Sequence, residues 1–149
     1  MKRISDEYSP VRKSQTVYGS ISVNYAFRGE KTIWCESTLE RDFLIKQEFN
    51  NNVIDIVSQP ITIPYITELG NESTYTPDFL VQFSSANCGD FEEIPCPLLI
   101  EIKPRKKLID DWDKLKPKFK AAHTFAKEKG WKFRIINETR LYDQYWENI

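Results

Sequence analysis

The sequence predicts an α/β protein in which a mixed β-sheet is flanked by α-helices. Strand-like patterns recur between residues 21 and 103, a long helical pattern follows over 110–129, and a last strand pattern spans 131–136. A strand, a helix and a second strand in this order form a right-handed crossover, which makes the two strands parallel neighbours. The earlier strands are close enough in sequence to pair through short turns. The sheet is therefore expected to contain both orientations.

Strands are predicted where apolar side chains alternate with polar ones, or form short runs bounded by turn residues. These segments are residues 21–27, 33–35, 53–57, 61–66, 73–83, 98–103 and 131–136. Residues 68–72 read as a hairpin loop around Gly70. Residues 84–97 contain glycine and prolines and are expected to form a loop. Pro104 ends the pairing of the 98–103 strand.

Two helices have sequence signals at their ends. Ser37 and Glu40 form the S-x-x-E pattern of a capping box, so the first helix begins after Ser37. The second helix covers 110–129 and is expected to be ended or kinked at Pro117, which lacks the backbone N–H. Gly130 is well suited to its C-terminal cap.

The 149 residues, with a net charge of −1, fit one domain with its own core. The polar residues 1–16 are expected to be a loosely held lead-in, and 138–149 a short aromatic-rich helix. No apolar run is long enough to span a membrane, and the N-terminus lacks the apolar core of a secretion signal. Three scattered cysteines do not form a disulfide scaffold. A cytoplasmic protein is expected.

The sequence around Asp78 and Glu101 is the main functional signal. Pro77-Asp78 lies in an apolar segment, and Glu101 and Lys103 lie two residues apart on a second apolar strand, so they share a face. Charges on a buried strand are costly unless they are paired. Two carboxylates and a lysine in this arrangement can hold a divalent metal and activate a water. An ordinary salt bridge between neighbouring strands is the simpler alternative.

Mg²⁺ prefers oxygen ligands, so Asp78 and Glu101 are its predicted ligands, with the main-chain carbonyl of Ile102 as a further one. Mn²⁺ is expected to substitute, and the number of ions stays open. Lys103 is expected to lie near the attacking water or the phosphate. Glu40 is the predicted fourth member of the site, entering from the first helix. Its alternative role is to satisfy the helix cap.

A basic run follows the predicted site. Eight Lys or Arg residues and three acids lie between residues 103 and 120. Such a face can hold a phosphate backbone, although a solvated helix face is the simpler explanation. The predicted DNA-binding residues are Arg105, Lys106, Lys107, Lys114 and Lys118.

Several motifs occur in an order that resembles one family. These are Ser9–Lys13, Glu36–Asp42, Gln59–Tyr65, Tyr75–Phe79 and Ile100–Lys103. Together they are similar to the N-terminal nuclease domain of TnsA, the endonuclease subunit of heteromeric cut-and-paste transposons. The resemblance implies a restriction-endonuclease-like core with a PD-(D/E)xK site, in which Glu40, Asp78, Glu101 and Lys103 take the catalytic positions.

The resemblance also implies Mg²⁺-dependent cleavage of double-stranded DNA at the transposon 5′ ends. The implied partners are a DDE-type transposase, which cuts the 3′ ends, and an AAA+ ATPase regulator. Gln59 falls in the family's Gln-Pro element and is a candidate for supporting the site. Some members carry Gln where Glu101 stands. The winged-helix-like domain of longer members is not expected within these residues.

Two other functions stay open on the sequence alone. A stand-alone nuclease of the repair, junction-resolving or restriction type would use the same residues. A non-catalytic module that holds a partner on DNA would keep the fold, although it would not need the buried charges.

Overall fold

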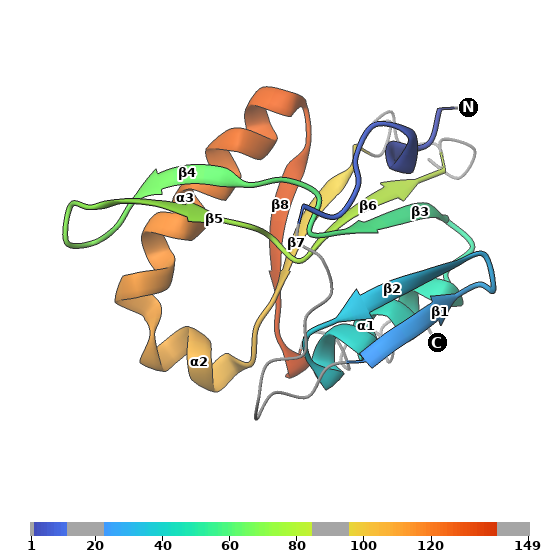
Figure 1. Cartoon of the computed structure of the whole chain (residues 1–149). Coiled ribbons are helices and arrows are strands. Elements are labelled where there is room, and N and C mark those ends of the chain that lie inside the picture. The colour runs from blue at the N-terminus through green and yellow to red at the C-terminus, as the bar shows by residue number, and fades with distance from the viewer. Residues whose placement is uncertain (1, 12–22, 85–95, 140–149) are drawn as a thin grey trace, which may run out of the picture.

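The computed structural model describes residues 2–11, 23–84 and 96–139. Its centre is a four-stranded sheet with the order β3-β6-β7-β8 (Figure 1). The strands are β3 (Val53–Ser58), β6 (Phe79–Phe83), β7 (Leu98–Ile102) and β8 (Lys132–Ile136). β7 and β8 are parallel, whereas β3–β6 and β6–β7 are antiparallel. The predicted α/β class with a mixed sheet is confirmed.

Two hairpins stand beside this sheet as separate two-stranded units. They are β1 (Val23–Phe27) with β2 (Lys31–Cys35), and β4 (Ile63–Ile66) with β5 (Glu72–Tyr75). The first hairpin packs against the first helix, and β4 packs against the long C-terminal helix. Figure 1 shows the two hairpins on opposite sides of the molecule. Gly70 turns the second hairpin with a φ of 84°, which glycine adopts without strain.

The helices are α1 (Thr38–Glu48), α2 (Arg105–Asp110) and α3 (Trp112–Lys129). The predicted capping box is confirmed, because Ser37 Oγ accepts from the Glu40 amide and Glu40 Oε2 accepts from the Ser37 amide, both at 3.1 Å. At the other end of α1, the Arg28 guanidinium donates to main-chain carbonyls, including those of Gln47 and Asn50. At both ends of α1, side chains therefore satisfy some of the backbone groups that the helix leaves without partners.

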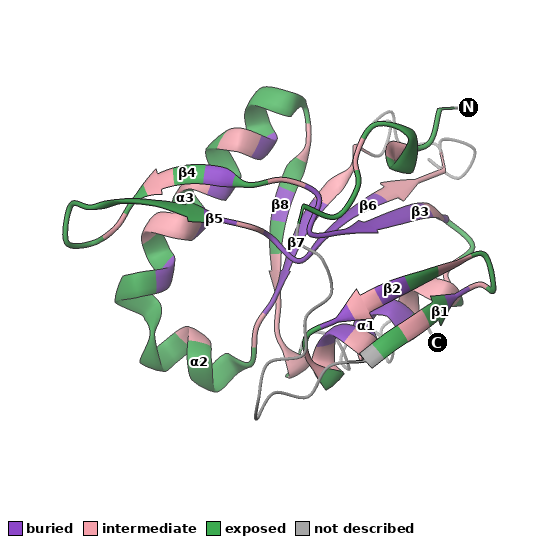
Figure 2. Cartoon of the chain, viewed as in Figure 1, coloured by how far each residue is buried: buried purple, intermediate pink, exposed green. Residues whose placement is uncertain are grey.

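The core lies on both faces of the sheet. On one face, under α1 and the first hairpin, it includes Phe43, Phe79 and Ile100; on the other, under α3, it includes Leu99 and Phe119. Consecutive residues of β7 thus serve opposite clusters, as strand alternation requires. Figure 2 shows the central strands buried and α2 mostly exposed.

The predicted single strand 73–83 is wrong. β5 ends at Tyr75 and β6 begins at Phe79, with Asp78 in the break. The two pieces belong to different sheets, because β5 pairs with β4 whereas β6 lies between β3 and β7. Pro77, which has no N–H to give to a ladder, lies at the crossing point.

The predicted helix boundary is also wrong. A separate helix, α2, begins at Arg105 and ends at Asp110, the break falls at Asp111, and α3 continues through Pro117. The buried side chains of Leu115 and Phe119, one before and one after Pro117, both pack into the same cluster under the sheet. This packing compensates for the hydrogen bond that proline removes. Gly130 ends α3 with a φ of 77°, as predicted.

The described part of the lead-in is held in place, contrary to the expectation. A short 3-10 helix, η1 (Ile4–Asp6), donates its first amides to Gln82 Oε1 and Asp55 Oδ2, each at 2.9 Å. The described ranges do not include residues 12–16 of the lead-in, most of the predicted 84–97 loop or residues 140–149. Within those ranges, no helix has the length and apolarity needed to cross a membrane.

Candidate active site

Asp78 is hydrogen-bonded to β7 through both its backbone and its side chain. Its amide donates to the Ile100 carbonyl at 3.0 Å, and its Oδ2 accepts from the Ile102 amide at 2.7 Å. Glu101 lies between these two residues, near the end of β7. The antiparallel pairing of β6 with β7 therefore brings the two predicted carboxylates to the same end of the sheet.

Glu40 joins them from α1. Its side chain is 7% exposed, against 9% for Asp78 and 4% for Glu101. The carboxyl group of Asp78 is in side-chain hydrogen-bonding contact with those of Glu40 and Glu101. The structure thus brings together three acids that are far apart in the sequence. We refer to Glu40, Asp78 and Glu101 as the acidic cluster.

The acidic cluster is short of positive charge. Burial, together with the neighbouring Asp78, raises the pKa of Glu40 to about 9. Burial and the adjacent Glu101 raise the pKa of Asp78 well above its usual range, and burial raises that of Glu101. At neutral pH Glu40 therefore retains its proton, in a cluster that lacks the cations that would normally accompany buried acids.

Lys103 follows β7 directly and is partly buried. Its amide donates to the Ile136 carbonyl at 3.0 Å, which ties it to β8. Burial raises the pKa of Glu101, and the positive charge of Lys103 partly offsets this rise. The Lys103 ammonium is therefore close enough to act on this carboxylate. Lys103 thus sits beside the acidic cluster, as the ExK spacing predicts.

The donor set of the acidic cluster fits a hard divalent cation. Hydrogen bonds from the protein fix one oxygen of each acid: the Ser37 and Glu36 amides bond Glu40, the Ile102 amide bonds Asp78, and the Tyr75 hydroxyl bonds Glu101. The acids also contact one another, and a cation there would replace their protons. Among the described residues, no three acid, histidine or cysteine side chains are already arranged as a metal cage.

Gln59 lies next to the acidic cluster and is 6% exposed. Its φ of 45° is in the left-handed region, which costs about 1–2 kcal/mol for a residue with a side chain. Its amide donates to the Asp78 carbonyl at 2.7 Å, its carbonyl accepts from Val11 at 3.0 Å, and its side chain donates to Glu36 Oε1 at 2.9 Å. These contacts link the end of β3 to Asp78 and to the residues before α1.

Tyr75 is a site residue that the sequence analysis missed. It ends β5, is 7% exposed, and its hydroxyl donates to Glu101 Oε2. Its ring packs against Phe119 with centroids 6.3 Å apart. Its position three residues before Asp78 was the signal in the sequence that could have identified it. Because an unbroken strand was predicted over 73–83, the crossing between β5 and β6, at which Tyr75 turns toward β7, was not expected.

The five predicted DNA-binding residues lie on α2 and α3. Arg105, Lys106 and Lys107 are exposed on α2, directly after the site. Lys114 lines a hollow together with acids of the α2–α3 junction. Lys118 lies over the Tyr75 ring, with Nζ 5.9 Å from the centroid.

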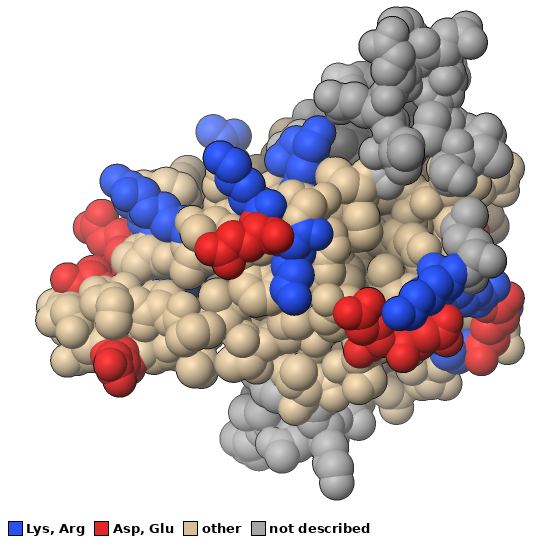
Figure 3. Space-filling view, turned by 90° about the horizontal axis from the view of Figure 1, so that it is seen from above, with Lys and Arg blue, Asp and Glu red and all other residues tan. Residues whose placement is uncertain are grey.

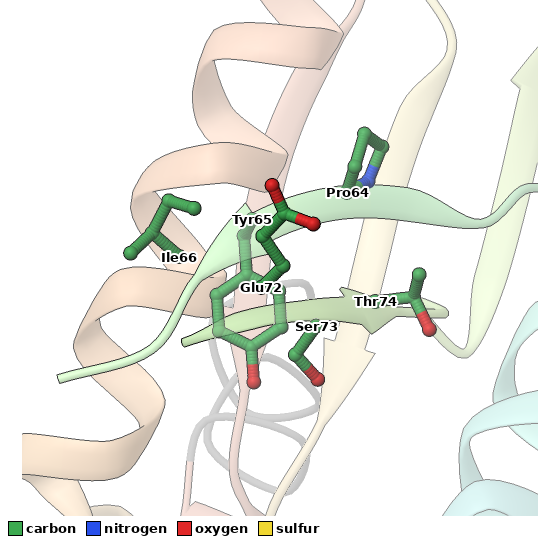
Figure 4. Close-up of a pocket in the computed structure, with 6 residues that line it drawn as sticks. All are labelled: Pro64, Tyr65, Ile66, Glu72, Ser73 and Thr74. Atoms are coloured by element: carbon green, nitrogen blue, oxygen red, sulfur yellow. The ribbon is translucent and has the colours of Figure 1, made fainter. Parts of the chain in front are cut away.

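A separate hollow of about 520 Å³ lies along the β4–β5 hairpin (Figure 4). Its lining residues are Pro64, Tyr65, Ile66, Glu72, Ser73 and Thr74. Glu72 is its single carboxylate, and no member of the acidic cluster lines it. This hollow is therefore distinct from the candidate site.

Comparison with protein families matches residues 50–138 to the model described as TnsA-like endonuclease N terminal. The match covers more than half of the chain. The chain belongs to this family. No curated protein matches the sequence.

The TnsA-like assignment agrees with the restriction-endonuclease-like architecture of the sheet and helices. The matched residues include Asp78, Glu101, Lys103 and Gln59. Glu40 precedes them, so its place in the site rests on its contact with Asp78.

Proposed function

We propose that this chain is a metal-dependent DNA endonuclease that cuts one strand at the 5′ ends of a transposon. The observation that carries this proposal is the convergence of Asp78, Glu101 and Glu40 in one buried cluster, with Lys103 beside it. Membership of the TnsA-like endonuclease family supports a DNA substrate and a transposase partner in general. The specific partners proposed are a DDE-type transposase and an AAA+ ATPase regulator.

Asp78 and Glu101 are the proposed ligands of Mg²⁺, supplemented by Glu40 and the Ile102 carbonyl. Bound Mg²⁺ would supply a nucleophilic water and neutralise phosphate charge. Tyr75 and the Ile102 amide orient the two principal carboxylates through one oxygen each. Mn²⁺ is expected to replace Mg²⁺.

Lys103 is the proposed electrostatic catalyst. When a water oxygen attacks phosphorus and a P–O ester bond breaks, extra negative charge develops on the phosphate oxygens. An ammonium beside the acidic cluster stabilises that charge electrostatically.

The test is cleavage of labelled transposon-end DNA with Mg²⁺ or Mn²⁺, with and without the transposase encoded beside the gene. Cuts at the 5′ ends that require the transposase would support the proposal. Cuts by the protein alone would favour a stand-alone nuclease. Absence of both cleavage and calorimetric Mn²⁺ binding would favour a non-catalytic docking module.

Asp78→Asn is the informative variant in this assay, because it keeps the shape of the side chain and removes its ability to ionise. Glu72→Gln is the matched control, since Glu72 is an exposed glutamate on β5 outside the acidic cluster. Loss of cleavage in both variants, or in neither, would contradict the assignment of the site.

A further inference from the structure

A basic groove lies between α3 and the edge strand β8, with a volume of about 450 Å³. Lys116, Lys120 and His123 line it from α3, and Arg134 lines it from β8. All four side chains are exposed. No carboxylate is among the described residues that line the groove. We call this surface the α3–β8 groove.

Helical spacing separates the charges of this region. Trp112, Lys116 and Lys120 recur every four residues and therefore share one side of α3. The acids at the start of the helix, including Asp113, line a different hollow that faces the tip of the β4–β5 hairpin. Although the net charge of the whole chain is −1, the α3–β8 groove is locally positive.

Figure 3, which views the molecule from above, shows the same separation on a wider scale. In the left and middle of this view, where Figure 1 has α3 and β8, Lys and Arg side chains outnumber the acids, whereas at the right they are closely mixed with acids. A local excess of positive charge attracts a polyanion.

The α3–β8 groove also has an aromatic floor and rim. Phe119 and Phe133 are buried in the floor, with ring centroids 5.8 Å apart. Trp112 is 44% exposed at one end and packs on Phe119 at 6.1 Å. A half-exposed indole beside lysines offers a surface on which a base or sugar can stack.

The groove begins near the candidate site. β7 and β8 are parallel, so their C-terminal ends share the edge of the sheet at which Glu101 lies, and α3 starts from that edge with Trp112. Phe119 connects the two surfaces, because its ring contacts Tyr75 on one side and forms the groove floor on the other. DNA leaving the site at this edge meets Trp112 first.

We propose that the α3–β8 groove binds the sugar-phosphate backbone of the DNA substrate, which deepens the proposed function and rests on it. Lys116 and Lys120 are about 6 Å apart along the helix axis, so each can contact a different phosphate. Arg134 adds a positive charge at the edge strand β8, where it lines the groove. Such contacts position the DNA without reading its sequence.

The experiment is a salt titration of duplex binding by the intact chain in EDTA, measured by fluorescence anisotropy. The test variant carries Lys116→Glu and Lys120→Glu. The matched control carries Lys127→Glu and Lys129→Glu, two exposed residues of the same helix outside the groove that give the same change in net charge. We expect the groove variant to bind at least about tenfold more weakly and to lose about two from the slope of log affinity against log salt.

Equal loss in both variants would mean a general charge effect and would overturn the proposal. So would unchanged affinity of the groove variant, or no binding by the unaltered chain at low salt. Trp112→Ala and Lys116→Ala with Lys120→Ala provide milder tests if the charge reversals prevent folding. Mn²⁺ binding, measured by calorimetry, reports on the acidic cluster independently of DNA binding. If only the groove proposal is wrong, Mn²⁺ still binds; if the proposed nuclease site is wrong, Mn²⁺ binding is lost.

Discussion

Asp55 and Asp78 are two buried aspartates close to the same sheet, yet their surroundings are opposite. Asp55, 3% exposed, accepts from Lys31 Nζ at 2.6 Å and from the Ser5 amide at 2.9 Å. Burial alone would raise its pKa, but these hydrogen bonds lower the pKa below the usual value. Asp78 instead has the carboxyl groups of Glu101 and Glu40 as neighbours, and burial together with Glu101 raises its pKa well above the usual range.

This difference separates a structural acid from a candidate catalytic one. The charge of Asp55 is already neutralised within the fold, where it connects the first hairpin and η1 to β3. The acidic cluster around Asp78 has more carboxylates than nearby cations, and this arrangement is stable only with protons or a metal. A buried acid without a compensating positive charge is therefore a stronger sign of function than a buried acid as such.

The largest expected effect is on cleavage. Asp78→Asn should reduce transposase-dependent cleavage about 10³-fold, because it removes a charged ligand from the reacting centre. Single-turnover kinetics at saturating DNA measures this loss. Asp55→Asn is the matched comparison, and a similar loss of cleavage in correctly folded Asp55→Asn would contradict the distinction between the two acids.

The second effect is on stability. Asp55→Ala should cost about 2–3 kcal/mol, less than a fully buried pair, because Lys31 keeps 31% exposure and regains water when its partner is lost. In EDTA, Asp78→Asn should leave stability unchanged or raise it, since it removes an acid whose ionisation is disfavoured by burial and by Glu101, and keeps an oxygen for the Ile102 amide. Urea unfolding measures both, and equal destabilisation would show that the cluster is as well compensated as Asp55.

The third effect concerns the hydrogen bond to Glu101. Tyr75→Phe keeps the ring in its cluster with Phe119 and removes only the hydroxyl. We expect Mn²⁺ affinity to fall about tenfold, in line with other groups that orient metal ligands. Calorimetry measures the affinity, and thermal unfolding serves as the control for packing. Unchanged affinity would mean that Tyr75 only fills space.

The smallest effect is a pH dependence with opposite signs at the two sites. The pKa of Glu40 is raised from 4.5 to about 9, so its contribution to stability is full below about pH 4.5 and is lost as the pH rises toward 9. The pKa of Asp55 is lowered, so its contribution is present above its ordinary value and is lost in acid.

Unfolding in EDTA at several pH values tests this difference. Glu40→Gln should flatten the decline between pH 5 and 9, and Asp55→Asn should flatten the decline in acid. If Glu40→Gln left the neutral-to-alkaline slope unchanged, the acidic cluster would not be the source of that slope.

The sequence by itself determined most of the elements and the chemistry of the candidate residues. The capping box, the hairpin at Gly70, the end of α3 at Gly130 and the parallel crossover all depend on local patterns that do not need the rest of the fold. The ExK spacing placed Glu101 and Lys103 together because strand alternation is also local.

Only the tertiary structure decided how these pieces meet. The break at Pro77 follows from two sheets competing for residues 73–83, and the continuity of α3 through Pro117 follows from packing on both sides of that proline. The contact of Glu40 with Asp78, the bond from Tyr75 to Glu101 and the pairing of Asp55 with Lys31 join residues that are distant in the chain. Whether a buried acid is neutralised depends on such neighbours, so the sequence supplied the acids and the fold determined which of them carry uncompensated charge.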